Sequence, residues 1–108
     1  MNQNSVILSQ IGNIYNSRVS LPKKICDAVG LRNKDFVSIV NIIGNKSFDV
    51  NKYDPNIQYN EQFGFIREVK NSHFTNPPES ILADLDANQE RTTLCQLLDN
   101  GTIRVSLC

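Results

Sequence analysis

Hydrophobic and polar positions alternate in several short segments of the chain, as they do in half-buried β-strands. In the first half we predict strands at residues 5–11, 18–21, 36–43 and 46–50. In the second half we predict them at residues 63–66, 92–98 and 102–107, with a further short strand after a polar turn within residues 71–76. Two turns, Gly44-Asn45 and Asp99-Asn100-Gly101, supply the positive φ values that tight hairpins need. The pattern therefore predicts a mainly β protein, with residues 12–17 as a polar turn.

One segment departs from the alternation and has the period of a short helix. Pro22 fits the first helical turn because its φ is fixed and its missing N–H has no partner there. Ile25, Ala28 and Val29 then fall on one face. Gly30 follows, and glycine ends helices readily in the left-handed conformation. Residues 18–40 thus form a strand, a short helix and a second strand.

A weaker version of this order returns near residues 73–98. Aligning Pro78 with Pro22 places Ile81 on Ile25 and Leu85 on Val29. We therefore predict three parts: a first unit at 1–52, a linker at 53–62 and a second, divergent unit at 63–108. An unrelated β-rich tail that pairs with the first half is the alternative.

Charge divides the chain in the same way. The 11 basic and 11 acidic side chains cancel, which is unusual for a strong nucleic-acid binder. Residues 1–55 nevertheless hold seven Lys or Arg and four acids (7 − 4 = +3), and residues 56–108 hold four and seven (4 − 7 = −3). A polyanion should therefore meet the first half.

The run around the helix resembles the AbrB-like superfamily of swapped-hairpin DNA-binding domains, which includes SpoVT-AbrB, MazE and MraZ proteins. The residues that match its pattern are Arg18, Val19, Leu21, Pro22, Ile25, Val29, Gly30, Leu31 and Asp35. In addition, Ile11-Gly12-Asn13 is similar to the opening of MazE-type antitoxins. The resemblance implies a swapped-hairpin β-barrel in which two strand–helix–strand units interleave. Both units would come from one chain, as in MraZ-type members.

The same resemblance implies a DNA-binding transcriptional regulator that contacts duplex DNA through basic side chains of the first unit. Arg18 occupies the family's arginine position, and Lys23 and Lys24 follow at the start of the helix. From the second half, Lys70 and Arg67 are further candidates, with Glu68 between them. The alternative for the two helix lysines is a solvated helix face.

Two other functions are compatible with the sequence. A MazE-like antitoxin, or a protein-interaction module that has lost DNA binding, would use the acidic second half to bind a protein partner. In either case we expect a homodimer or a larger homo-oligomer.

Catalytic and metal chemistry have little support in the sequence. The chain has one histidine and an odd number of cysteines, with no C-x-x-C pair among them (Cys26, Cys95 and Cys108). It also has no phosphate-binding loop, nucleophile motif or metal-ligand spacing. We therefore expect no enzyme, no metal and no cofactor. No apolar run is long enough for a membrane span, so we expect a soluble cytoplasmic protein with reduced thiols.

Overall fold

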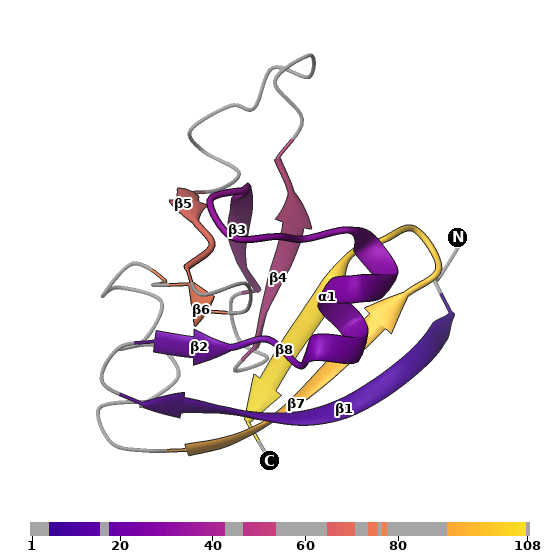
Figure 1. Ribbon diagram of the computed structural model, residues 1–108. Helices are drawn as coiled ribbons and strands as arrows, with labels where there is room; N and C mark the ends of the chain where they lie inside the picture. The colour runs from indigo at the N-terminus through magenta and orange to yellow at the C-terminus, as the bar shows by residue number, and fades with distance from the viewer. Residues whose placement is uncertain are drawn as a thin grey trace.

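The structure is a computed structural model that describes residues 5–15, 18–42, 47–53, 65–70, 74–75, 77 and 91–107. These residues form one helix and eight strands (Figure 1). In the first half the elements are β1 (Val6–Tyr15), β2 (Arg18–Ser20), α1 (Lys23–Val29), β3 (Phe36–Ile42) and β4 (Ser47–Lys52). In the second half they are β5 (Phe65–Glu68), β6 (Phe74–Thr75), β7 (Arg91–Leu98) and β8 (Ile103–Leu107). The prediction of a mainly β protein is confirmed.

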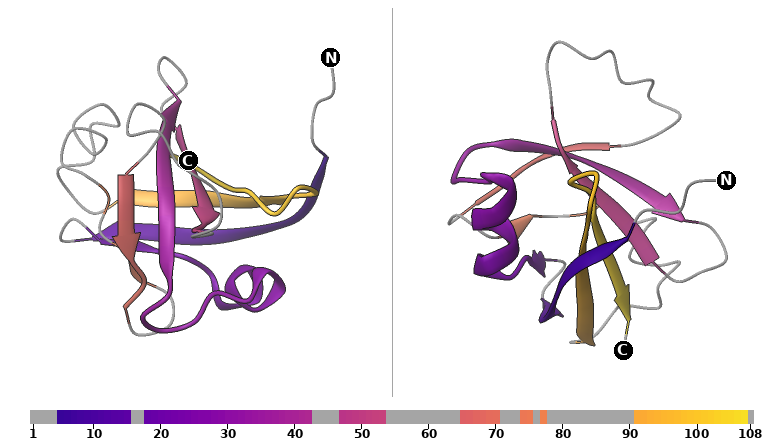
Figure 2. Two further views of the ribbon diagram at one scale, coloured as in Figure 1. Left: turned by 90° about the horizontal axis from the view of Figure 1, so that it is seen from above. Right: turned by 90° about the vertical axis from the view of Figure 1, so that its right-hand side faces the viewer.

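All eight strands belong to one antiparallel sheet in the order β5-β3-β4-β8-β7-β1-β2-β6. The sheet curls into a half-barrel, so that β1 and β7 run across the direction of β3 and β5 (Figure 2). Each strand of the second half pairs with a strand of the first: β5 with β3, β6 with β2, β7 with β1 and β8 with β4. The two halves thus share a single sheet.

The inner face of the sheet holds one hydrophobic core. Phe48, Ile39 and Val50 from the first half are fully buried beside Ile103 and Val105 from the second. Burial of a side chain of this size contributes about 1.5–3 kcal/mol relative to exposure. The core therefore depends on both halves.

Helix α1 begins after Pro22 and ends at Gly30, as the sequence predicts, but its predicted apolar face is wrong in part, because Ala28 is exposed and Cys26 is buried instead. Pro22 precedes it with ψ 140°, outside the helical range, and its carbonyl accepts bonds from the N–H groups of Ile25 and Cys26 at 3.0 Å. Gly30 ends it with φ 74°. Ile25 and Cys26 are buried in the core, and they attach the helix to the inner face of the sheet.

Strand β1 is longer than the sequence predicts. The polar turn expected at residues 12–17 is wrong for residues 12–15, which continue the strand. Gly12 and Asn13 pair with Thr93 and Thr92 on β7, and this distant strand overrides their local preference for a turn.

Other boundaries shift by a few residues. Strand β4 reaches Lys52, and β5 continues to Glu68 where the sequence predicts an end at residue 66. Pro78, Ile81, Leu85 and most of the expected linker lie outside the described residues. Within the described part of the chain, no helix is long and apolar enough to cross a membrane.

Candidate nucleic-acid interface

Arg18 lies at one end of the sheet, where β2 begins. It pairs with Tyr15, the last residue of β1, and both side chains are exposed. A cation and an aromatic ring therefore stand side by side on adjacent strands. Val19, the next residue, is fully buried and fixes the strand to the core.

Strand β6 brings the second half of the chain to the same end. Val19 pairs with Thr75, which is also fully buried. The Thr75 Oγ1 hydroxyl donates to the backbone carbonyl of Glu68 at 3.4 Å, which ties β6 to the end of β5. Lys70 follows two residues later and is exposed. Residues Arg18 and Lys70, both predicted site residues, therefore lie in the same region of the sheet.

A third cation joins them from the turn before β3. The N–H of Lys34 donates to the carbonyl of Val69 at 2.8 Å, and the N–H of Val69 donates to the carbonyl of Asp35 at 2.7 Å. Lys34 has φ 72°, an uncommon conformation for a side chain with a Cβ. The paired hydrogen bonds hold this turn against β5, with the Lys34 side chain exposed.

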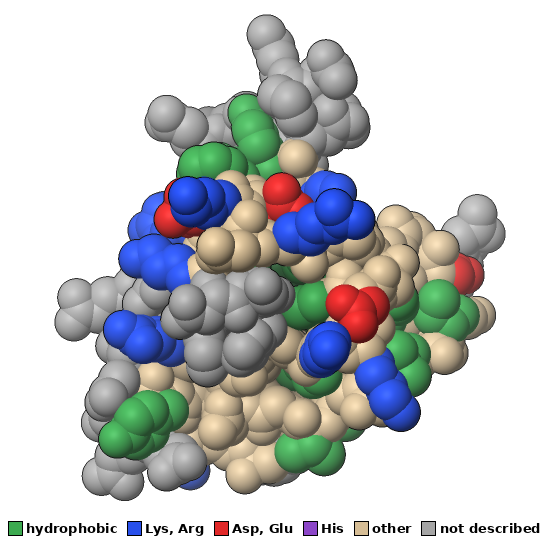
Figure 3. Space-filling view, in the orientation of Figure 1, with side chains coloured by type: hydrophobic (Ala, Val, Ile, Leu, Met, Phe, Trp, Pro, Cys, Tyr) green, Lys and Arg blue, Asp and Glu red, His purple; other side chains and the backbone are tan. Residues whose placement is uncertain are grey.

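Arg67 completes the group. Its guanidinium lies 5.8 Å from the ring centroid of Phe65, within the range of a cation–π contact, and its Nη1 donates to the carbonyl of Ile66 at 2.9 Å. These contacts hold the guanidinium beside β5, partly exposed. We call Arg18, Lys34, Arg67 and Lys70 the basic edge. In the space-filling view, Lys and Arg side chains gather over β5, β6 and β2, at the left of Figure 3.

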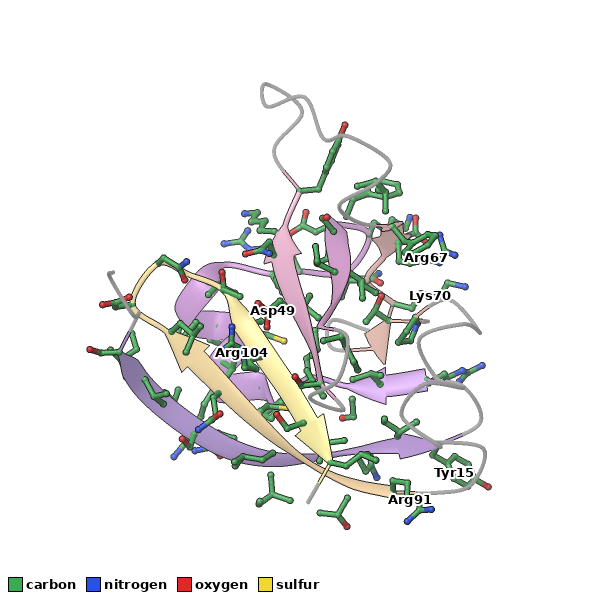
Figure 4. All side chains as sticks on the ribbon, turned by 180° about the vertical axis from the view of Figure 1, so that it is seen from behind. Tyr15, Asp49, Arg67, Lys70, Arg91 and Arg104 are labelled. Carbon is green, nitrogen blue, oxygen red and sulfur yellow. The ribbon has the colours of Figure 1, made fainter. Side chains whose placement is uncertain are left out.

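Figure 4 shows the molecule from the opposite direction, with the basic edge now at the right. Arg67 and Lys70 point away from the sheet on one side, and Tyr15 and Arg91 lie farther along that side. Arg91 begins β7 and pairs with Ile14 of β1, next to Tyr15. Acidic neighbours are present as well: Glu68 is exposed on β5. Asp35, beside Lys34, is partly exposed, so among the described residues of this region the cations of the basic edge outnumber the carboxylates.

The two helix lysines stand apart from this group in the fold. Lys23 and Lys24 are exposed on the first turn of α1. Asp27 follows at the spacings that place side chains on one helix face, so it offsets part of their charge. Acidic and basic side chains accordingly lie together over α1 in Figure 3.

One further arginine is engaged in a different part of the sheet. Arg104 on β8 pairs with Asp49 on β4, through Nε–Oδ1 at 2.9 Å and Nη2–Oδ2 at 3.2 Å. The hydrogen bond that Arg104 donates to the Asp49 carboxylate raises the pKa of Arg104. Figure 4 shows this pair in the middle of the sheet, away from Arg67 and Lys70. Its charge is already balanced by a fixed partner.

Sequence reasoning did not identify Lys34, Tyr15 or Arg91 as neighbours of the predicted site. Their positions depend on pairing between residues far apart in the sequence, and no local motif signals it. The prediction that Lys23 and Lys24 contact DNA rests on the family resemblance alone.

The described residues offer no alternative centre of metal or thiol chemistry. They contain no cluster of three or more His, Cys, Asp or Glu side chains, and His73 lies outside them. Burial raises the pKa of the Cys26 thiol to about 11, with a smaller contribution from the charge of Asp27, so this cysteine stays protonated at neutral pH.

Comparison with known proteins adds no information about this interface. No protein-family model matches the sequence, and no curated protein matches it. The candidate interface therefore rests on the arrangement of its own side chains.

Proposed function

We propose that this protein is a DNA-binding transcriptional regulator of the AbrB-like, swapped-hairpin kind, and that it contacts duplex DNA through the basic edge. The observation that carries the proposal is the convergence of cations from both halves of the chain. Arg18 comes from β2, Lys34 from the turn before β3, and Lys70 from the end of β5. Such a group suits a phosphate backbone, which proteins bind mainly through Lys and Arg.

The strand pairing supports two interleaved units. If residues 5–52 and 65–107 are treated as two copies, β5 to β8 correspond to β1 to β4. The first strand of each copy then pairs with the third strand of the other, as β1 with β7 and β5 with β3. The second strands pair with each other, as do the fourth. Two units that exchange hairpins would give this order.

The register agrees with that interpretation. Val19 pairs with Thr75, and Asp49 pairs with Arg104. These partners lie 56 (75 − 19) and 55 (104 − 49) positions apart. A pair of equivalent residues that face each other marks a two-fold axis between the copies. The separation of 56 also equals the one that aligns Pro78 with Pro22 in the sequence.

A pair away from the axis is consistent with the same two offsets. Gly12 pairs with Thr93. Advancing Gly12 by 55 positions and moving Thr93 back by 56 gives Arg67 and Val37, and these two residues also pair. The correspondence therefore extends to strand pairs on both sides of the β4–β8 pair, which favours a repeat over an unrelated tail.

The chemistry of the basic edge favours contacts with phosphates. Lysine acts as a flexible point charge, and arginine can bind two phosphate oxygens or a guanine edge. The exposed ring of Tyr15 beside Arg18 adds a hydrogen-bonding hydroxyl that can reach a phosphate or a base. Because the net charge of the chain is zero, attraction to DNA should be local and moderate.

The proposal is tested by titrating generic duplex DNA with the protein at several salt concentrations, using fluorescence anisotropy. Three variants accompany the wild type: Arg18→Ala with Lys70→Ala, Lys23→Ala with Lys24→Ala, and Arg32→Ala, which removes a single exposed cation outside both groups. We expect the first variant to bind more weakly and to lower the slope of log affinity against log salt by about 1.8, or about 0.9 for each lost phosphate contact.

The helix-lysine variant decides whether α1 also meets the duplex. A comparable loss of slope would extend the interface to Lys23 and Lys24, whereas an unchanged slope would confine it to the basic edge. No binding by the wild type at low salt would contradict the proposal. The MazE-like or protein-interaction function, with a protein partner on the acidic second half, would then be favoured.

A further inference from the structure

Strand β1 carries the most exposed large hydrophobic side chains among the described residues. Ile7 is 63% exposed, Ile11 is 64% exposed and Val6 is 45% exposed. Ile11 pairs with Leu94 on β7, which is partly exposed, so the apolar area continues onto the next strand. We call these four residues the β1 surface. Apolar side chains gathered in this way on a water-facing surface typically mark an interface.

The same strand offers free backbone groups. β1 pairs with β7 along its length, but with β2 only from Asn13 to Tyr15. In the described part of the chain, no strand pairs with the other edge of residues 6–11, although α1 also contacts β1, and β1 is the outermost strand at the lower right of Figure 1. Unpaired N–H and C=O groups along such an edge can bind another strand.

Proteins usually protect exposed edges with charged side chains. Here residues 5–15 contain no Lys, Arg, Asp or Glu at all. The one interruption is a register shift between Val6 and Leu8, which leaves residues 8–11 as a regular edge. Asp99, whose N–H donates to the Ser5 carbonyl at 2.9 Å, lies beyond the start of the strand. Among the described residues, no strand covers this edge, and it is suited to a partner that is itself uncharged.

We propose that the β1 surface is the interface of a homodimer in which β1 pairs antiparallel with β1 of a second copy across a two-fold axis. A two-fold interface uses the same patch on both subunits, and an uncharged apolar edge is complementary to itself. The net charge of zero also means that two copies do not repel each other. DNA is a poor occupant for this surface because it holds no cation.

This inference does not depend on the proposed function. The β1 surface and the basic edge share no residue, so the dimer can be tested without DNA, and duplex binding can be tested on variants that retain the dimer.

Sedimentation velocity of the full chain over a range of concentrations tests the interface. We expect the wild type to reach twice the chain mass of 12.2 kDa. Ile11→Lys places a charge on the edge and should weaken the dimer at least tenfold, and Ile7→Lys provides a second, independent variant. Because both side chains are highly exposed, both variants should keep the far-UV circular dichroism of the wild type, and their unfolding midpoints should equal that of the wild type at concentrations where it is monomeric.

Phe36→Lys is the matched control. Phe36 is 47% exposed on β3, away from the β1 surface. Its replacement with lysine should therefore leave dimerisation unchanged. A wild type that stays monomeric at every concentration would overturn the inference. So would a dimer that survives both isoleucine substitutions, or one that Phe36→Lys weakens equally.

Discussion

Gly12 holds β1 close to both of its neighbours, and replacing it with alanine should destabilise the fold. A Cβ at this position would lie 2.7 Å from the backbone oxygen of Ser20, 3.0 Å from Thr93 Oγ1 and 3.2 Å from Cys95 Sγ. The first contact is with the main chain, so no rotamer change can relieve it. Thr93 and Cys95 are fully buried and have little room to move. Strand β1 must therefore shift away from residue 20.

The expected size of this effect follows from two opposing contributions. Overpacking of a well-packed site costs about 1–3 kcal/mol, whereas replacing glycine with alanine recovers about 0.4–1 kcal/mol through the unfolded chain. The difference spans about 0–2.6 kcal/mol, and we expect a net loss of about 1–2 kcal/mol because the main-chain contact cannot relax; at about 4–8 °C per kcal/mol this is a decrease in Tm of roughly 4–16 °C. Urea and thermal unfolding followed by circular dichroism measure both quantities.

A second substitution separates the main-chain contact from side-chain crowding. Cys95→Ala removes the sulfur near Gly12 but leaves the Ser20 oxygen in place. If the backbone contact dominates, the cost of Gly12→Ala should be nearly the same with and without Cys95→Ala. Full rescue by Cys95→Ala would assign the effect to the sulfur, and a Gly12→Ala variant as stable as the wild type would refute the reasoning altogether.

Two other predictions concern buried or paired groups. The Arg104 side chain is 41% exposed and that of Asp49 is 18% exposed, so their bidentate pair should contribute only about 0.5–1 kcal/mol to the stability of the fold. The coupling energy of a double-mutant cycle with Asp49→Asn and Arg104→Gln measures this contribution. A coupling energy of zero would mean that water competes fully for the pair. The folded-state pKa of Cys26 is raised from 9.0 to about 11, so the unfolded chain loses this proton first. The associated stability is fully present below about pH 9 and is lost as pH rises to about 11. Wild-type unfolding free energy should therefore fall more steeply over this range than that of Cys26→Ala, and parallel curves would contradict the assignment.

The features that the sequence predicted correctly are those held by nearby residues. Helix α1 begins after Pro22 and ends at Gly30 because a fixed φ and a left-handed glycine act within one turn. The turn before β8 is equally local: Gly101 has φ 89°, and the Asn100 side chain accepts a bond from the N–H of Thr102 at 3.0 Å. Such interactions can be identified from a few consecutive residues.

The structural features that the sequence did not predict depend on partners far away along the chain. Residues 12–15 have a turn-forming composition, yet pairing with β7 extends them as a strand. Lys34 joins Lys70 only because its N–H reaches the carbonyl of Val69. Of the four predicted site residues, Arg18 and Lys70 come together through strand pairing, which sequence spacing does not reveal.

The proposed symmetry of the strands is not matched by the charges. Under the correspondence that aligns Pro78 with Pro22, Arg18 aligns with Phe74, and Lys23 aligns with Glu79. A chain with two equivalent units would thus carry one basic face, not two, since the second unit lacks the same cations. Regulators that bind two-fold symmetric DNA sites use two copies of one contact surface. A homodimer through β1 would supply the second basic edge from another chain, so the uncharged strand and the asymmetric charge distribution have a common explanation.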